Sequence, residues 1–241
     1  MTAAATYLDT AIGFLRRAAE REAGALAAAA LAASEAVARG GVIYLFGTGH
    51  SHLMAEEGHF RAGGLACVVP ILATPIMLHE GAIASTRFER MSGLAEIVLG
   101  RYPISSGDVL FVFSTSGVNA VPVEAASYGR ARGAHVVAMT SIDYSTAAAH
   151  GRTRLADVAD TVIDTGAPPG DAAVAIDGTL HAGPVSTVLA AGLLNAVFVQ
   201  VAANLAAGGH EPPVYVSANM PGAAERNREL AERYRARNPH L

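Results

Sequence analysis

The chain has 241 residues, of which 51 % are hydrophobic and 16 % are charged, and its 17 basic and 21 acidic side chains give a formal net charge of −4. This composition excludes disorder over most of the chain, because disordered segments combine low hydrophobicity with high charge. It also argues against nucleic acid as a partner, because no excess of basic side chains is available to neutralise phosphates along a strand.

All 17 basic residues are arginine. The lack of lysine excludes Schiff-base chemistry and a phosphate-binding loop of the Walker A type, because both need a lysine amine. Cys67 is the only cysteine and lies in an apolar run, so no intramolecular disulfide can form and a packing role is favoured. The first twenty residues carry no signal-peptide pattern, and we therefore expect a cytoplasmic protein.

The predicted elements alternate between helix and strand. Residues 1–40 form an N-terminal helical region, which ends at Gly40-Gly41. Five short apolar runs predict strands that are buried on both faces, at residues 42–46, 66–71, 109–113, 135–139 and 158–163. Helical periodicity lies between several of these runs, at residues 52–62, 88–99 and 120–132. This alternation is typical of an α/β protein with a mainly parallel sheet.

The last part of the chain contains an uncharged stretch, residues 182–209, that is long enough to resemble a membrane span. Pro184 and the amide side chains in this stretch favour a helix buried in a soluble core, and we expect no membrane partner. Residues 208–241 begin with a proline-rich extended segment and continue as a charged helix over residues 223–237. We expect one domain over residues 1–241, with its α/β core at residues 41–207.

Two predicted strands run into turns that are rich in glycine and hydroxyl residues. Gly47-Thr48-Gly49-His50-Ser51 follows the strand at residues 42–46, and Ser114-Thr115-Ser116-Gly117 follows the strand at residues 109–113. Ligands of open α/β sheets lie beyond the carboxyl ends of the strands, where unpaired N–H groups at helix starts favour an anion. The alternative is that the serines only cap the next helix. The predicted phosphate-binding residues are Gly49, His50, Ser51, His52, Ser114, Thr115, Ser116 and Asn119.

These turns resemble those of the sugar isomerase (SIS) domain family. The stretch Ser114 to Asn119, with Glu124 after it, is similar to the family pattern S-x-S-G-x-T followed by glutamate, except that Asn119 stands where threonine or serine is usual. Further stretches, such as residues 46–52, 55–57, 78–81 and 212–217, resemble small single-domain bacterial members similar to phosphoheptose isomerases and N-acetylmuramic acid 6-phosphate etherases.

The resemblance implies an SIS-type three-layer α-β-α sandwich with a five-stranded parallel sheet. It also implies a homodimer or homotetramer, in which a neighbouring subunit completes the site, and a sugar phosphate, such as an amino-sugar 6-phosphate, as the small-molecule partner.

The candidate catalytic residues are Glu57, His79 and Glu80. A carboxylate or imidazole beside an opened sugar can remove the acidic C2 proton. Glu57 shares a predicted helix face with Leu53 and Phe60, a mostly inward stripe, whereas the adjacent Glu56 is expected to be solvated. Nothing matches a metal-binding spacing such as H-E-x-x-H, so we predict neither a metal nor another cofactor.

Three functions remain open on the sequence alone. The first is a lyase that dehydrates an N-acetylamino-sugar 6-phosphate, such as N-acetylglucosamine 6-phosphate, by abstracting the C2 proton and expelling the C3 hydroxyl. The second is an aldose–ketose isomerase that acts on a sugar phosphate. The third is a regulator that binds a sugar phosphate without catalysis, although residues 1–40 leave no room for a helix-turn-helix. The carboxylates and histidines near the two turns favour an enzyme over the regulator, and we expect the lyase first.

Overall fold

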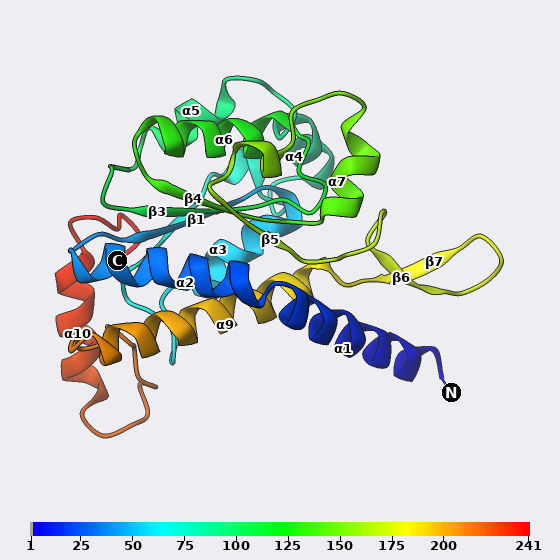
Figure 1. Cartoon of the computed structure of the whole chain (residues 1–241). Helices are drawn as coiled ribbons and strands as arrows, with labels where there is room; N and C mark the ends of the chain where they lie inside the picture. Colours follow the sequence, from blue (N-terminus) through cyan, green and yellow to red (C-terminus); the bar gives the residue numbers. More distant parts are fainter. Residues whose placement is uncertain (1) are drawn as a thin grey trace.

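A five-stranded parallel sheet forms the centre of the molecule (Figure 1). The structure is a computed structural model and describes residues 2–241. The strand order is β2-β1-β3-β4-β5, and neighbouring strands pair in parallel throughout. The strands are β1 (Ile43–Gly47), β2 (Val68–Ile71), β3 (Val109–Phe113), β4 (His135–Thr140) and β5 (Thr161–Asp164). The predicted five-stranded parallel sheet is confirmed.

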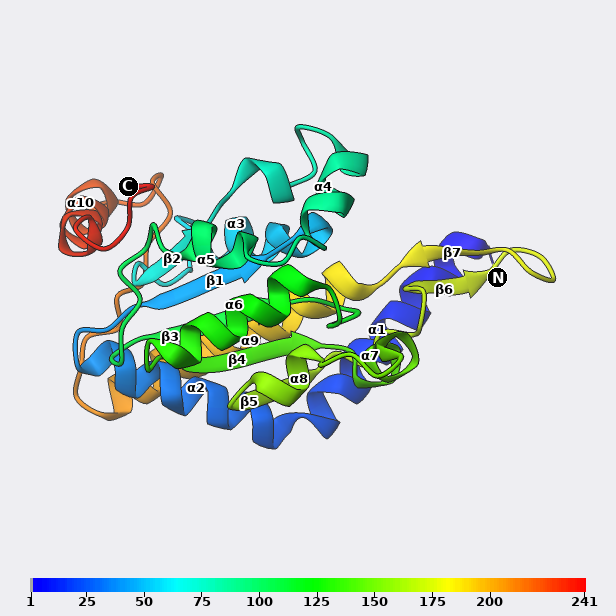
Figure 2. The ribbon, with the colours of Figure 1, turned by 90° about the horizontal axis from the view of Figure 1, so that it is seen from above.

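Helices cover both faces of the sheet, so the predicted three-layer sandwich is confirmed (Figures 1 and 2). One face carries α2 (Ala23–Ala38), α3 (Leu53–Gly58) and α9 (Ser186–Ala207), and the other carries α5 (Leu94–Leu99), α6 (Ala120–Ala131) and α8 (Leu155–Val158). Every residue of β1, β2 and β3 is buried, which explains why their sequences are continuous apolar runs.

The N-terminal helix α1 (Ala3–Arg21) extends away from the sheet together with a hairpin, β6 (Ala172–Ala175) and β7 (His181–Pro184), as Figure 2 shows. A small apolar cluster of Ala11, Val185 and Leu189 joins α1 to the base of the hairpin. The Tyr7 hydroxyl donates to the Pro184 carbonyl at 2.8 Å and fixes the hairpin to α1. The sequence reasoning missed this hairpin, because its strands are short and largely exposed.

Several predicted boundaries were wrong, each for a local reason. The helical region at residues 1–40 is two helices that meet at Glu22. Helix α3 ends at Gly58, so Phe60 lies beyond it and is exposed rather than inward. The predicted helix at residues 88–99 is two helices, α4 (Ala82–Phe88) and α5, because Gly93 adopts a left-handed conformation between them. Val158 belongs to α8, which Arg154 and Asp157 cap, and not to a strand.

Helix α9 occupies most of the uncharged stretch, and it is long and apolar enough to cross a membrane by length and composition alone. It packs against α2, α1 and α3, but only 39 % of its most apolar 18-residue stretch is buried inside the chain. The expectation of a helix buried in a core therefore holds for one of its faces. Val188 and Val199, on the remaining surface, are exposed.

The C-terminal segment folds back over the edge of the sheet at β2. Residues 211–215 are extended as predicted, and Val214 pairs with Leu65 in an isolated antiparallel bridge. After α10 (Ala223–Tyr234), the Arg237 guanidinium donates to the fully buried carboxylate of Asp108 at 2.8 Å. The charged helix predicted over residues 223–237 is confirmed, although it ends at Tyr234.

Other labelled segments are the 3-10 turns η1 (Gly49–His52) and η2 (Thr74–Ile76) and the helix α7 (Ile142–Ala149).

Candidate functional site

The strand order places the two predicted turns beside each other. β1 and β3 are neighbours, yet the chain continues from β1 to β2 on one side and from β3 to β4 on the other. The connections that leave the carboxyl ends of β1 and β3 therefore diverge and open a crevice between them. In open α/β sheets this reversal of strand order is where ligands bind.

The turn after β1 is shaped by two glycines. A Cβ on Gly47 would lie 2.3 Å from the carbonyl oxygen of Ser51, so only glycine fits this close approach. Gly49 has a φ of 55°, in the left-handed region that favours glycine. The Ser51 N–H donates to the Thr48 carbonyl at 2.9 Å, whereas the N–H groups of Gly49 and His50 have no acceptor within residues 2–241.

The turn after β3 leaves a second pair of N–H groups free. Gly117 has a φ of 60°, and its N–H donates to the Ser114 hydroxyl at 3.2 Å. The Thr115 carbonyl accepts from Ser141 N–H at the end of β4, which holds the turn against the sheet. The N–H groups of Thr115 and Ser116 have no acceptor in the described part of the chain. The Ser114 hydroxyl thus shapes the turn, and the two free amides can bind a ligand.

Both turns line one cavity of about 300 Å³. The cavity is bounded by the β1 and β3 turns, by α4, by α7 and by the start of α9. A second, small hollow of about 20 Å³ lies between the two turns and the first residues of α9 and shares several lining residues with the cavity. The polar side chains of this cavity are those of Thr48, His50, Ser51, Ser85, Thr86, Glu89, Ser114, Thr115, Ser116, Asn119, Tyr144, Asp171 and Ser186.

Glu89, directly after α4, is a cavity residue that the sequence reasoning missed. Its carboxylate accepts from the Thr48 hydroxyl at 2.8 Å and from the Asn119 amide at 2.9 Å, and so links the β1 turn to the β3 turn. Arg90 forms an ion pair with the same carboxylate at 3.0 Å. Gly93 was the available signal in the sequence, because a glycine there predicts a break between two helices, and Glu89 then follows the first of them into the cavity lining.

Asn119 was predicted to bind phosphate in place of the usual threonine or serine. In the structure its side-chain amide donates to Glu89, and the side chain lines the cavity. Glu124, in contrast, accepts from Gly93 N–H at 2.8 Å and joins α6 to the start of α5, which is a structural role.

A second carboxylate of the cavity, Asp171, caps α9. It accepts from the N–H groups of Val185 and Ser186 at 3.0 and 2.8 Å and from the Ser186 hydroxyl at 2.6 Å. Asp171 has a φ of 63° and lies at the base of the β6–β7 hairpin. This carboxylate therefore ties the hairpin to the start of α9 and is a capping group.

Glu57 does not line this cavity. It faces a separate groove of about 370 Å³ between α3 and α9, where its carboxylate pairs with Arg61 and accepts from the Asn195 amide at 3.0 Å. Its predicted inward stripe is absent, because the helix ends before Phe60. Glu56 is exposed, as expected.

The predicted histidines separate into three environments. His50 is exposed and lines the cavity. His52 is buried, its Nδ1–H donates to the Gly49 carbonyl, and its Nε2 lies 3.4 Å from Glu56, so it braces the β1 turn from behind. His79 and Glu80 are exposed on the turn before α4 and do not line the cavity, whereas the preceding Leu78 does. The His79 ring lies 6.3 Å from that of His52.

Cys67 is fully buried, and burial raises the pKa of its thiol to about 12. The thiol therefore stays protonated at neutral pH, which confirms the packing role. Within residues 2–241 no three His, Cys, Asp or Glu side chains group closely enough to hold a metal ion.

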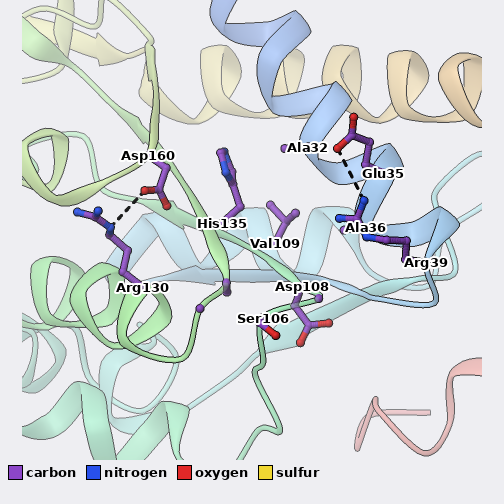
Figure 3. A pocket seen from close by; sticks show the side chains of 13 residues that line it. Ala32, Glu35, Ala36, Arg39, Ser106, Asp108, Val109, Arg130, His135 and Asp160 are labelled. Atoms are coloured by element: carbon purple, nitrogen blue, oxygen red, sulfur yellow. Dashed lines mark ion pairs between the residues drawn. The ribbon is translucent and has the colours of Figure 1, made fainter.

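The largest other hollows differ from this cavity in chemistry. A cavity of about 400 Å³ lies at the opposite end of the sheet, where the strands begin, and Figure 3 shows its side chains. Arg130 pairs there with Asp160 at 3.2 Å and Arg39 with Glu35 at 3.8 Å, and Asp108 pairs with Arg237, outside the cavity, at 2.8 Å. A third hollow of about 410 Å³ adjoins α6 and includes Arg90 and Arg152.

The comparisons with known proteins agree with this fold. The SIS domain profile matches residues 6–141, and the chain belongs to the SIS domain family. A UPF0309 protein of Brucella anthropi is 53 % identical over 236 residues, which cover 98 % of this chain and 97 % of the relative. A UPF0309 protein of Brucella canis is 58 % identical over 200 residues, 83 % of this chain and 82 % of the relative.

Solved structures show the same architecture. A phosphoheptose isomerase from Neisseria gonorrhoeae superposes with a TM-score of 0.56 at 19 % identity, over 83 % of this chain and 97 % of that one. A phosphoheptose isomerase from Francisella tularensis gives a TM-score of 0.56 at 16 % identity, over 83 % and 98 % of the two chains. At this identity the likeness concerns the fold.

Proposed function

We propose that the chain binds a sugar phosphate in the cavity between the β1 and β3 turns and acts on it as a cytoplasmic enzyme. The observation that carries the proposal is the convergence of four free N–H groups, those of Gly49, His50, Thr115 and Ser116, on one cavity at the reversal of strand order. Free amides at such a position are suited to an anion.

The size and lining of the cavity support a small phosphorylated ligand. Its volume of about 300 Å³ is at the lower end of the range for ligand pockets, which suits a monosaccharide phosphate better than a dinucleotide. No arginine lines it, so the phosphate would be held by amides and hydroxyls. Those groups bind through directed hydrogen bonds.

The proposed reaction is the dehydration of an N-acetylamino-sugar 6-phosphate. In the open-chain aldehyde the C2 proton is acidic, and a carboxylate removes it. The C3–O bond then breaks as an acid supplies a proton, so that one water leaves and a C2–C3 double bond forms. A 2-acetamido sugar cannot become a simple 2-ketose without losing its acetamide group, which is why elimination is the accessible outcome.

Glu80 and His79 are the proposed acid–base pair. Both side chains are exposed on the turn before α4, and the preceding Leu78 lines the cavity. Glu57 is the alternative base, but its groove lies between α3 and α9. Proton transfer by a positioned group contributes about 10²–10⁴-fold to the rate.

The test is to incubate the protein with N-acetylglucosamine 6-phosphate and to follow substrate mass and ultraviolet absorbance. Loss of one water with a new conjugated chromophore supports the lyase. Glu80→Gln is then expected to lose turnover by about 10²-fold or more while it keeps substrate affinity. Glu57→Gln is the matched carboxylate control, and loss of turnover in that variant alone would move the base to the α3–α9 groove.

Aldose–ketose isomerisation of a sugar phosphate is the second candidate, favoured by the fold shared with phosphoheptose isomerases. The same cavity would bind the phosphate, and the C2 proton would return to C1. If N-acetylglucosamine 6-phosphate stays unchanged, conversion of aldose phosphates to ketose phosphates is the next assay. Ligand binding without either reaction would favour the non-catalytic regulator.

We also propose that the chain assembles as a homodimer or homotetramer. Large apolar side chains are exposed on α1 and on the β6–β7 hairpin, namely Leu8, Ile12, Ile176 and Leu180. Water-exposed apolar patches of this kind are typical of protein interfaces. Sedimentation equilibrium is expected to give a dimer or tetramer mass, and a monomer at micromolar concentration would contradict the assembly.

A further inference from the structure

The buried hydroxyl of Ser85 has no partner. Ser85 lies on α4, is 1 % exposed and lines the cavity, yet its Oγ makes no hydrogen bond within residues 2–241. A buried hydroxyl without a partner costs free energy, and most such groups in proteins are satisfied by protein, water or ligand. A helical serine can donate its hydroxyl to the carbonyl four residues earlier. The Gly81 carbonyl accepts from the Ser85 N–H at 2.9 Å, but the Ser85 hydroxyl makes no second bond to it.

Glu89 lies four residues beyond Ser85, one helical turn further along the same face. Its Oε2 accepts only from Thr48 within the described chain, and each carboxylate oxygen has two lone pairs. Ser85 and Glu89 therefore present, side by side, a hydroxyl that has no partner and a carboxylate with acceptor capacity left.

The two ends of the cavity differ in charge. Glu89 places a carboxylate at the α4 end of the cavity. Its Oε1 pairs with Arg90, which does not line the cavity, and its Oε2 has no charged partner within residues 2–241. The free amides of Thr115 and Ser116 lie at the β3 turn. A phosphate dianion is repelled by a carboxylate and stabilised by free amides. The phosphate therefore belongs at the β3 turn, and an uncharged part of the ligand belongs at α4.

We propose that Ser85 and Glu89 form a subsite for the sugar hydroxyls of the ligand. Glu89 accepts a hydrogen bond from one hydroxyl, and Ser85 bonds to a neighbouring oxygen while the phosphate occupies the β3 turn. The subsite deepens the proposed function and rests on it. It selects sugar monophosphates whose far end is neutral and hydroxylated, and it rejects bisphosphates and sugar-acid phosphates, which would bring a second anion to Glu89.

Calorimetric titration of Ser85→Ala tests the subsite. The probes are N-acetylglucosamine 6-phosphate, glucose 6-phosphate and inorganic phosphate. The variant is expected to bind the sugar phosphates about 5–10-fold more weakly, the effect of one hydrogen bond, and inorganic phosphate as the wild type does. Its melting temperature without ligand should equal or exceed that of the wild type, because the change removes an unsatisfied group. Ser127→Ala, which removes an exposed serine hydroxyl of α6, is the matched control.

The possible results distinguish failure of the subsite from failure of the whole binding site. If the wild type binds neither phosphate nor sugar phosphate, the proposed function and the subsite both fall. If the wild type binds both and Ser85→Ala binds sugar phosphates as tightly as before, or loses affinity for phosphate equally, the subsite is wrong and the phosphate site stands. A melting temperature clearly below that of Ser127→Ala would show a structural role for Ser85 and would overturn the subsite.

Glu89→Gln tests the charge separately. The wild type is expected to bind fructose 6-phosphate more tightly than fructose 1,6-bisphosphate. In the neutral variant the ratio of the two affinities should be smaller. An unchanged or wider difference would overturn the exclusion of a second anion.

Discussion

Gly117 is the residue at which the geometry of the proposed phosphate-binding turn can be tested most sharply. It has a φ of 60°, and a Cβ there would lie 2.7 Å from the Thr140 hydroxyl oxygen. Gly117→Ala combines two costs: about 1–2 kcal/mol for an L-residue in the left-handed region and about 1–3 kcal/mol for the clash. The total of about 2–5 kcal/mol corresponds to a melting temperature about 4–20 °C lower in a chain of this length.

The control is Gly209→Ala. Gly209 has a φ of 77°, but a Cβ on it meets nothing within 4 Å, and it lies beyond the far end of α9. This variant carries the backbone cost alone, about 1–2 kcal/mol, and should keep ligand affinity. Differential scanning calorimetry and ligand titration of both variants are the assays.

The double variant Gly117→Ala/Thr140→Ala removes the oxygen that the new Cβ meets. Its loss of stability should be smaller than the sum of the losses of the two single variants, because the clash is shared between them. The reasoning is refuted if Gly117→Ala is no less stable than Gly209→Ala, or if it binds sugar phosphate as the wild type does.

Three further predictions concern the rest of the chain. Burial lowers the pKa values of His59 and His240 below 6.5 in the folded state, and repulsion by His240 lowers that of His59 further. The unfolded chain therefore binds more protons, and stability should fall as the pH drops below about 6.5. In His240→Gln the melting temperature should depend less on pH between pH 7.5 and 5. Arg237→Met should destabilise the chain by about 1–3 kcal/mol in urea, because it removes the charged donor from the buried carboxylate of Asp108. Cys67 should resist thiol reagents until the chain unfolds, because burial raises its pKa to about 12.

Each of these predictions has a result that contradicts it. A flat stability profile in the wild type would remove the histidine argument. For Arg237, the comparison is Arg228→Met, which removes a fully solvated pair with Glu225 and should change stability by less than about 1 kcal/mol. Equal effects of the two arginine changes would show that the buried carboxylate needs no charged partner. Rapid labelling of Cys67 in the native protein would show that β2 opens.

The sheet was predictable because its strands are buried on both faces. Residues 109–113 are β3 as predicted, and the other four strands fall within three residues of their expected starts. Strand ends were less predictable, since the capping pair at α8 and the left-handed Gly93 act through local geometry that periodicity does not register. The hairpin was not predicted, because its two four-residue strands have no apolar alternation.

The candidate site was predictable where the backbone alone creates it. The two turns follow directly from the strands, and the sheet order brings them together. Side chains from the connection between β2 and β3 were not predictable in the same way. Ser85 and Glu89 reach the cavity only because α4 folds over the carboxyl end of the sheet. Glu57 lies outside the cavity because α3, a helix of six residues, turns it toward the groove beside α9.

A crystal structure of the protein with N-acetylglucosamine 6-phosphate tests the central claim most directly. The account predicts the phosphate within hydrogen-bonding distance of the Thr115 and Ser116 amides and the sugar ring toward α4. Phosphate bound instead in the hollow beside Arg90 and Arg152, or in the cavity of Figure 3, would contradict it.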